Sequence, residues 1–179
     1  MHIKVEQSEK IYRGRAFDVR RDQIRLANGH LKQRDIVEHA ASVVIVPIDE
    51  SSLVWFVRQY RYPVGKYLLE LPAGVMEDGE TPQFTALRET REEIGMAPGS
   101  LIQIGEFFLA PGYSTEYMYV FLAQNLSPSP LQQDEDEDIE IEKLPLQTIL
   151  DLQKISRIQD AKTIAAMYLA HLYLLSQDE

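Results

Sequence analysis

The 179-residue chain has no cysteine, few basic residues and no long apolar run. Without cysteine it forms no disulfide, offers no thiolate to a metal and has no cysteine nucleophile. Its 18 Lys and Arg side chains stand against 28 Asp and Glu, and the net charge of −10 disfavours binding to a polyanionic nucleic acid. Charges interrupt the hydrophobic residues well before the roughly 20 apolar positions that a membrane span needs. We therefore expect neither nucleic acid nor membrane as a partner.

The first ten residues, MHIKVEQSEK, lack the apolar stretch of a signal peptide, so we expect a cytoplasmic location. A hydrophobic fraction of 45% in 179 residues is enough for one substantial core and favours a single globular unit with small additions. The acidic balance still permits a small phosphate-bearing substrate, because bound divalent cations reverse the local charge of an acidic site.

Strand-like sequence fills most of the N-terminal region. Short alternating stretches run from Ile3 to Val37, and the Asn28-Gly29 pair favours a hairpin turn. Two apolar runs follow at 43–48 and 53–57, and we expect them to be adjacent buried strands of the core sheet. These patterns predict a small N-terminal sheet in residues 1–40 and a main domain in residues 41–179.

Strand and helix signals alternate in the rest of the chain. A strand ends at Pro72, a turn is expected at Ala73-Gly74, and helix-forming sequence runs from about Pro82 to Ile94. Strands are predicted at 101–108 and 117–123, around a loop at 109–116. A second helix is predicted over 160–175, and the acidic run 134–138 is interpreted as a solvated loop.

Three carboxylates share one face of the first predicted helix. At about 100° per residue, Glu89, Glu92 and Glu93 lie together, with a packing face opposite. Like charges at these spacings repel by tenths of a kcal/mol, so the face needs either a cation or exposure to water. From the helix alone, a solvated face paired with Arg88 and Arg91 and a site for Mg²⁺ remain alternative interpretations.

The spacing around this helix separates the two interpretations. Fixed residues follow the pattern G-x5-E-x7-R-E-x-x-E-E-x-G, and their seven positions would coincide in a given window with a probability on the order of 10⁻⁸. With an apolar Met96 after it, the segment closely resembles the signature of the Nudix hydrolase family. Thr90 departs from that signature, in which a bulky aliphatic residue is usual. The fixed positions are Gly74, Glu80, Arg88, Glu89, Glu92, Glu93 and Gly95.

The resemblance implies a fold and a role for each signature residue. The implied fold is α+β, a mixed β-sheet sandwiched between helices, here with a small N-terminal antiparallel sheet. The implied ligands of Mg²⁺, or of Mn²⁺ as an alternative, are the carbonyl of Ala73 and the catalytic carboxylates of Glu89 and Glu93, and more than one ion is expected. Glu92 is a further ligand or an orienting group. We expect a structural role, which holds the ligands in place without taking part in the reaction, for Gly74, Glu80, Arg88 and Gly95.

Substrate choice depends on residues outside the signature. The segments 58–63 and 109–116 resemble the ADP-ribose pyrophosphatase branch of the family. That resemblance implies Mg²⁺-dependent hydrolysis of ADP-ribose to AMP and ribose 5-phosphate. Arg61 and Arg58 are expected either to bind phosphate or ribose oxygens or to pair with the surplus carboxylates. Glu116 is a candidate general base or water-positioning group, or else a residue of the rim, and Pro111 is a rigid turn in the same loop.

Members of this branch are typically homodimers whose N-terminal sheet crosses to the partner. Glu77 and Asp35 match substrate-contacting acidic positions, and Asp35 is expected to act in the partner's pocket. The alternatives are a pyrophosphatase for another nucleoside diphosphate sugar or a dinucleotide, and a catalytically weak module that senses such a metabolite. The intact carboxylate set argues against the sensing module.

Overall fold

The computed structural model describes residues 3–132, 138–147 and 157–177. The chain divides into two compact units, the first made of Met1–Ala41 with Phe108–Tyr117 and the second of Ser42–Phe107 with Met118–Glu179. Most of the acidic run that we interpret as a solvated loop lies outside the described residues. No helix among the described residues is long and apolar enough to cross a membrane.

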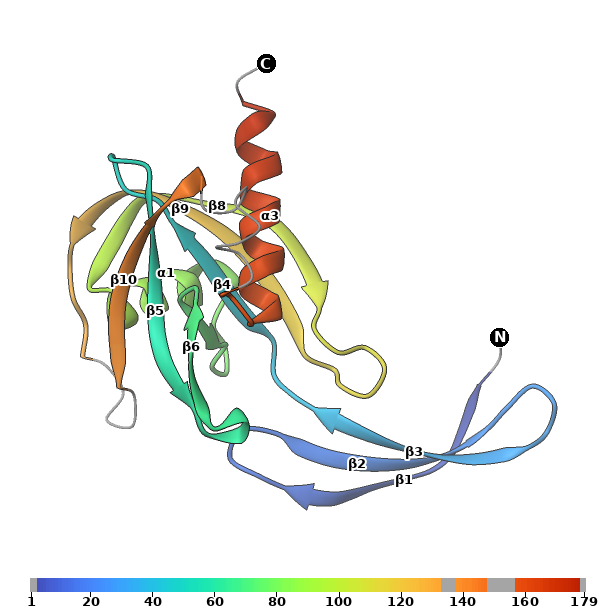
Figure 1. Ribbon diagram of the computed structural model, residues 1–179. Helices are drawn as coiled ribbons and strands as arrows, with labels where there is room; N and C mark the ends of the chain where they lie inside the picture. Colours follow the sequence, from blue (N-terminus) through green and yellow to red (C-terminus); the bar gives the residue numbers. More distant parts are fainter. Residues whose placement is uncertain (1–2, 133–137, 148–156, 178–179) are drawn as a thin grey trace. The chain divides into compact units, whose positions relative to one another are not determined.

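A three-stranded antiparallel sheet forms most of the first unit (Figure 1). Its strands lie in the order β1 (Lys4–Arg13), β2 (Asp18–Arg25) and β3 (Leu31–Glu38). Gly29, with a φ of 85°, lies in the turn between β2 and β3, which confirms the predicted hairpin. Ion pairs join Lys10 to Asp18 at 2.6 Å and Arg20 to Glu38 at 2.6 Å. Cross-strand charges therefore help to hold this sheet together.

The loop 109–116 is attached to the end of β3. The Val37 N–H donates to the carbonyl of Tyr113 at 2.8 Å, and the Thr115 N–H donates to the carbonyl of Val37 at 2.9 Å. These two bonds form a parallel bridge between Val37 and Ser114. The loop predicted between the two long strands thus exists, and it belongs to the same unit as the N-terminal sheet.

Two sheets form the second unit. A four-stranded mixed sheet has the order β7 (Ala73–Val75), β4 (Ser42–Pro47), β9 (Tyr117–Pro128) and β8 (Met96–Phe108), with β4 antiparallel to β7 and parallel to β9. A three-stranded antiparallel sheet has the order β10 (Ile139–Pro145), β5 (Leu53–Arg61) and β6 (Lys66–Glu70). A short 3₁₀ helix, η1 (Tyr62–Val64), connects β5 to β6.

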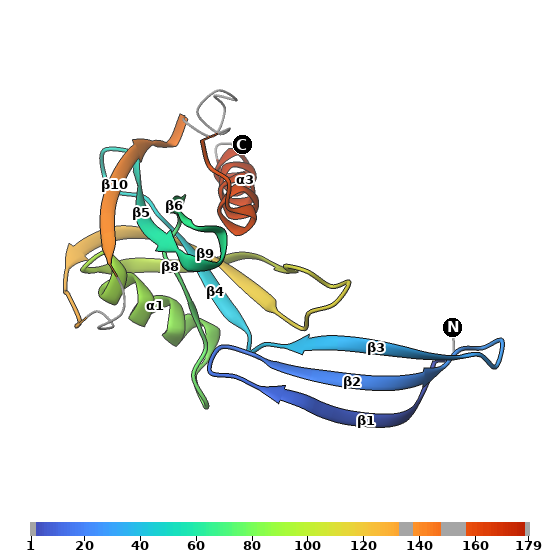
Figure 2. The ribbon, with the colours of Figure 1, turned by 60° about the horizontal axis from the view of Figure 1, so that its bottom comes forward.

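The four-stranded sheet lies between α1 (Pro82–Glu93) and α3 (Ala161–Leu175), as Figure 2 shows. Ala86 of α1 packs in one buried cluster with Val43 and Ile45 of β4. Side chains alternate along a strand, so Val44 and Val46 point to the other face of β4, and α3 also packs on this strand. The α+β fold with a mixed sheet between helices is therefore confirmed.

Three details differ from the sequence-based expectations. β4 and β5 are both buried but lie in different sheets, with an isolated bridge between Ile48 and Val54, because apolar runs do not specify which strands pair. The turn expected at Ala73-Gly74 is the strand β7, paired with β4. β10 is missing from the predicted strands, although the alternation in Ile139–Pro145 is typical of one.

Candidate active site

The three carboxylates lie on α1, whose ends are set by the local sequence. The Thr81 hydroxyl accepts a hydrogen bond from the Phe84 N–H at 3.3 Å, and Pro82 occupies the first turn. Beyond the helix, Gly95 has a φ of 70°, a conformation that favours glycine and ends the helix. The predicted helix is therefore confirmed, and its C-terminal end differs from the predicted one by a single residue.

Two of these carboxylates are buried. Glu89 is 8% exposed and Glu93 is 3% exposed, while Glu92 is half-buried. A face open to water, one of the two interpretations of the helix alone, is therefore wrong for Glu89 and Glu93. Burying two carboxylates one helical turn apart costs free energy unless cations or hydrogen-bond donors compensate for the lost water.

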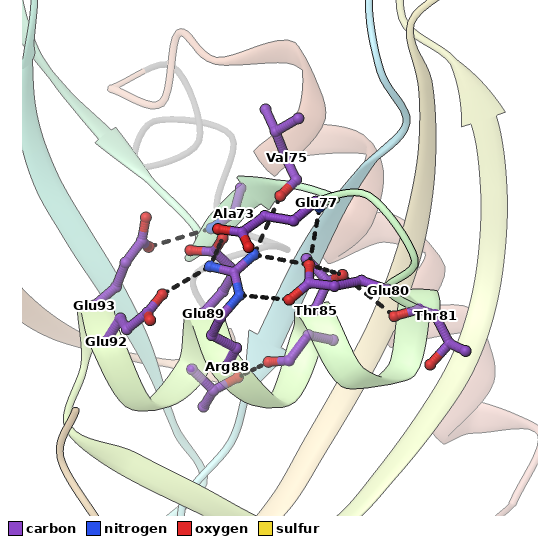
Figure 3. A network of polar contacts seen from close by, with 12 residues as sticks. Ala73, Val75, Glu77, Glu80, Thr81, Thr85, Arg88, Glu89, Glu92 and Glu93 are labelled. Atoms are coloured by element: carbon purple, nitrogen blue, oxygen red, sulfur yellow. Dashed lines mark hydrogen bonds and ion pairs between the residues drawn. The ribbon is translucent and has the colours of Figure 1, made fainter. Parts of the chain in front are cut away.

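Arg88 supplies part of that compensation, as Figure 3 shows. Its Nη1 donates to Glu89 Oε1 at 2.7 Å and to Glu92 Oε2 at 2.8 Å. Its Nε and Nη2 donate to the two carboxylate oxygens of Glu80 at 2.9 Å and 3.1 Å. Nη2 also donates to the carbonyl of Val75 at 3.2 Å. One guanidinium thus joins the loop before α1 to the carboxylates of the helix.

Glu80 lies near the end of this loop, two residues before α1. The hydrogen bonds from Arg88, with further ones from the Glu77 N–H at 3.0 Å and the Thr85 hydroxyl at 2.8 Å, lower the pKa of Glu80 to about 2. The same ion pair raises the pKa of Arg88. A carboxylate with so low a pKa and so many donors is a poor proton acceptor, which agrees with a supporting role.

The Glu80–Arg88 pair predicts an acid-sensitive contribution to stability. Because the pKa of Glu80 falls from 4.5 to about 2 on folding, its stabilisation is complete above pH 4.5 and is lost as the pH falls through 2. Glu80→Gln should flatten the pH dependence of the unfolding free energy in this window, measured by chemical denaturation. The control is Glu106→Gln, which removes an exposed carboxylate on β8. Equal pH slopes for the two variants would contradict the role given to Glu80.

The backbone of β7 lies directly against the buried carboxylates. The Ala73 N–H donates to Glu93 Oε2 at 3.2 Å. A Cβ added at Gly74 would lie 1.8 Å from Glu89 Oε1, so only glycine permits this approach. Pairing of Ala73 and Gly74 with β4 fixes the position of this backbone. The three residues that the signature implies as metal ligands, Ala73, Glu89 and Glu93, are therefore neighbours.

These residues fit a hard divalent cation. Carboxylate and carbonyl oxygens are the donors that Mg²⁺ prefers, and Gly74 leaves room for Glu89 beside the backbone. Among the residues that the structure describes, no three His, Asp or Glu side chains are arranged to hold an ion directly. In their present positions Glu89 and Glu92 are drawn to Arg88. Each of these carboxylates accepts from Arg88 through one oxygen, Oε1 of Glu89 and Oε2 of Glu92.

Comparison with known proteins identifies the family. The model of the NUDIX domain matches residues 38–167. The chain belongs to the Nudix family. It is 35% identical to the ADP-ribose pyrophosphatase of Bacillus subtilis (strain 168), over 92% of this chain and 90% of that protein. It is also 35% identical to the methanol dehydrogenase activator of Bacillus methanolicus, again over 92% of this chain and 90% of that protein.

A crystal structure of an ADP compounds hydrolase superposes with a TM-score of 0.90 at 26% sequence identity, covering 99% of this chain and 96% of that chain. The resemblance seen in the spacing of the signature is therefore confirmed, and the protein is a Nudix hydrolase. Nudix hydrolases generally use a divalent metal such as Mg²⁺, which agrees with the donors around Gly74.

Arg61 lies outside the Nudix signature and is paired with a carboxylate. Its Nε and Nη2 donate to the two oxygens of Glu70 at 2.8 Å and 2.7 Å. This is the pairing that the sequence leaves as the alternative to substrate binding. The Arg61 side chain is nevertheless 41% exposed, so the pairing does not prevent contact with a ligand. Arg58, on the same strand, is half-buried.

The other residues predicted for the active site of this Nudix hydrolase lie on different elements. Glu77 is exposed in the loop between β7 and α1. Asp35 accepts two hydrogen bonds from Arg21, at 2.7 Å and 3.0 Å, across β2 and β3. Glu116 is half-buried and its N–H donates to the Ser114 hydroxyl at 3.2 Å. Asp35, Glu116 and the exposed Pro111 belong to the first unit, and the signature belongs to the second.

Proposed function

We propose that this Nudix hydrolase catalyses the Mg²⁺-dependent hydrolysis of ADP-ribose to AMP and ribose 5-phosphate. The observation that carries the proposal is the burial of Glu89 and Glu93 against the backbone of Ala73 and Gly74. Burying two adjacent carboxylates costs free energy, so such pairs are unusual outside functional sites. The relatives named ADP-ribose pyrophosphatase and ADP compounds hydrolase support the substrate class.

Each residue has a proposed part in the reaction, in which water adds across the P–O–P linkage. Ala73, Glu89 and Glu93 would hold the metal, with Glu92 as a further ligand or orienting group. When bound, one or more Mg²⁺ or Mn²⁺ ions would supply positive charge against the diphosphate and a more acidic water. The ion pair between Glu80 and Arg88 keeps β7 against α1 and so fixes the ligand oxygens. Substrate contacts are assigned to Arg61, Arg58, Glu77 and Asp35.

A substrate panel tests the reaction and its specificity. Nucleoside diphosphate sugars and dinucleotides are incubated with Mg²⁺, and the products are identified by mass spectrometry. We expect the highest kcat/KM with ADP-ribose and the products AMP and ribose 5-phosphate. Dinucleotides belong in the panel because they contain the same diphosphate linkage and are the alternative substrates that the sequence leaves open. Tight binding without hydrolysis would favour a metabolite-sensing module instead.

Glu116 is proposed as the general base or as the group that positions the attacking water. Glu116→Gln is expected to lower kcat by about 10²-fold, the usual contribution of a positioned base, with little change in KM. Steady-state kinetics with ADP-ribose measure both effects, with Glu106→Gln as the control. An unchanged kcat would assign Glu116 to the rim of the site.

We also propose a cytoplasmic homodimer in which the N-terminal sheet, residues 1–40, contacts the partner and Asp35 acts in the partner's pocket. All of β1 is exposed, including its apolar residues Val5, Ile11 and Tyr12, and this strand is the surface that we assign to the partner. Light scattering measures the mass in solution, and a fully active monomer would contradict the dimer.

A further inference from the structure

The buried carboxylate of Glu70 joins α3 to β6, the strand that precedes Ala73 and Gly74. Glu70 is the last residue of β6, is 1% exposed, and lies three positions before Ala73. It accepts hydrogen bonds from Arg61 and, from the first turn of α3, from the ammonium of Lys162. Lys162 also pairs with Asp160 at 3.0 Å. Two cations and two carboxylates therefore meet beside the signature segment.

The first turn of α3 is held in place by its cap. Asp160 Oδ2 accepts hydrogen bonds from the N–H and the hydroxyl of Thr163, at 3.0 Å and 2.6 Å. The hydroxyl oxygen of Thr163, which is fully buried, accepts a bond from the Leu71 N–H at 2.8 Å. Adjacent residues of one helical turn thus hold Glu70 and Leu71, the two residues that precede Pro72 and Ala73. Lys162 is fixed relative to Glu70 by this arrangement.

The charges in this group balance. Arg61 and Lys162 carry two positive charges, and Glu70 and Asp160 carry two negative ones. Burial alone would raise the pKa of Glu70. The hydrogen bonds from Arg61 and the charge of Lys162 outweigh burial and lower this pKa, so the carboxylate stays ionised. Neither bond from Arg61 to Glu70 uses Nη1, and the side chain remains 41% exposed. One edge of the guanidinium is thus fixed, while the side chain stays accessible to a ligand.

We propose that Lys162 is a positioning residue for substrate binding. It neutralises Glu70, so that Glu70 orients the guanidinium of Arg61 without cancelling its attraction for an anionic diphosphate. This role rests on the proposed function, in which Arg61 contacts the substrate. Without Lys162 the group has a net charge of −1, which repels an anion and draws the guanidinium toward Glu70.

Lys162→Met tests the role, because methionine keeps an unbranched stem without the charge. The KM for ADP-ribose should rise about tenfold, the size expected for one weakened charge-assisted contact, with kcat changed less than about twofold. Lys162→Arg should restore the KM. The matched control is Lys66→Met: Lys66 donates to Gln159 at 2.7 Å, close in sequence to α3, and that bond does not involve Glu70. Its KM should stay within about twofold of the wild-type value.

A double-mutant cycle tests whether Lys162 acts through Arg61. Arg61→Gln alone should raise the KM, and adding Lys162→Met to it should cause no further rise, because the group on which Lys162 acts is gone. A normal KM in Lys162→Met, or a second tenfold rise in the double variant, would overturn the proposal. If Lys162→Met does not fold by circular dichroism, Lys162→Gln replaces it under the same criteria.

A measurement without turnover separates this proposal from the proposed function. The Arg61 Nε–H signal in a ¹H–¹⁵N spectrum reports its hydrogen bond to Glu70. Lys162→Met should shift that signal and change its exchange with water, and Lys66→Met should leave it in place. If the wild-type enzyme does not hydrolyse ADP-ribose, the proposed function fails, whereas an unmoved Arg61 signal overturns the positioning role in either case.

Discussion

Replacement of Glu93 by glutamine is expected to lower kcat for ADP-ribose about 10³-fold, which corresponds to about 4 kcal/mol of lost transition-state stabilisation. The amide has nearly the same shape as the carboxylate and keeps an oxygen that accepts the bond from the Ala73 N–H. It loses the negative charge that strengthens the binding of a hard cation. Glu89→Gln should have an effect of the same order, because Glu89 is buried on the same face.

The measurements for these two variants are kcat and KM with saturating Mg²⁺ and, separately, the thermal unfolding temperature without added metal. The unfolding temperature of Glu93→Gln should change little, because the amide keeps the volume of the side chain and an oxygen for the Ala73 N–H. Glu89→Gln should unfold at a lower temperature, because it loses the ion pair with Arg88. Glu106→Gln, on β8, gives the effect of removing an exposed carboxylate. Near-normal turnover in both Glu89→Gln and Glu93→Gln would contradict the metal site.

Gly74→Ala is expected to lower the activity at least about 10²-fold, the loss typical of a shift of about 1 Å in a catalytic group. The added Cβ would lie 1.8 Å from Glu89 Oε1 and 2.0 Å from its Cδ, so the carboxylate must move away. β7 cannot yield easily, since Gly74 is paired with Val43 in the sheet. We also expect a loss of about 1–3 kcal/mol of stability from the overpacking.

Two further variants show whether the clash with Glu89 is the cause. Gly112→Ala adds a methyl group where no atom lies within 4 Å, and its unfolding free energy should stay close to that of the wild type. Glu89→Asp combined with Gly74→Ala shortens the clashing side chain, and should recover stability but not activity. Full activity in Gly74→Ala alone would show that catalysis does not require the Glu89 carboxylate at its present position.

The sequence predicts the active helix better than the sheets around it. The bounds of α1 follow from Thr81, Pro82 and Gly95, and the grouping of its carboxylates follows from helical geometry, because each depends on residues close in the chain. The division of β4 and β5 between two sheets depends on pairing with distant strands, which periodicity does not encode.

Contacts between distant residues were the main part of the site that the sequence did not reveal. Lys162 and Thr163 reach Glu70 and Leu71 across 92 residues each. Both side chains are of types common in any helix, and no spacing marks them as partners of β6. Burial of Glu89 and Glu93 was equally hidden, since a solvated helix and a packed one have the same pattern of charges.

The two hydrogen bonds between Val37 and the loop 109–116 have a consequence for the proposed dimer. They tie Tyr113 and Thr115 to β3, so the backbone next to Glu116 is held against the N-terminal sheet. If the sheet is the surface through which two chains associate, association and the placement of Glu116 are thermodynamically linked. Association would then favour one placement by the same free energy by which that placement favours association.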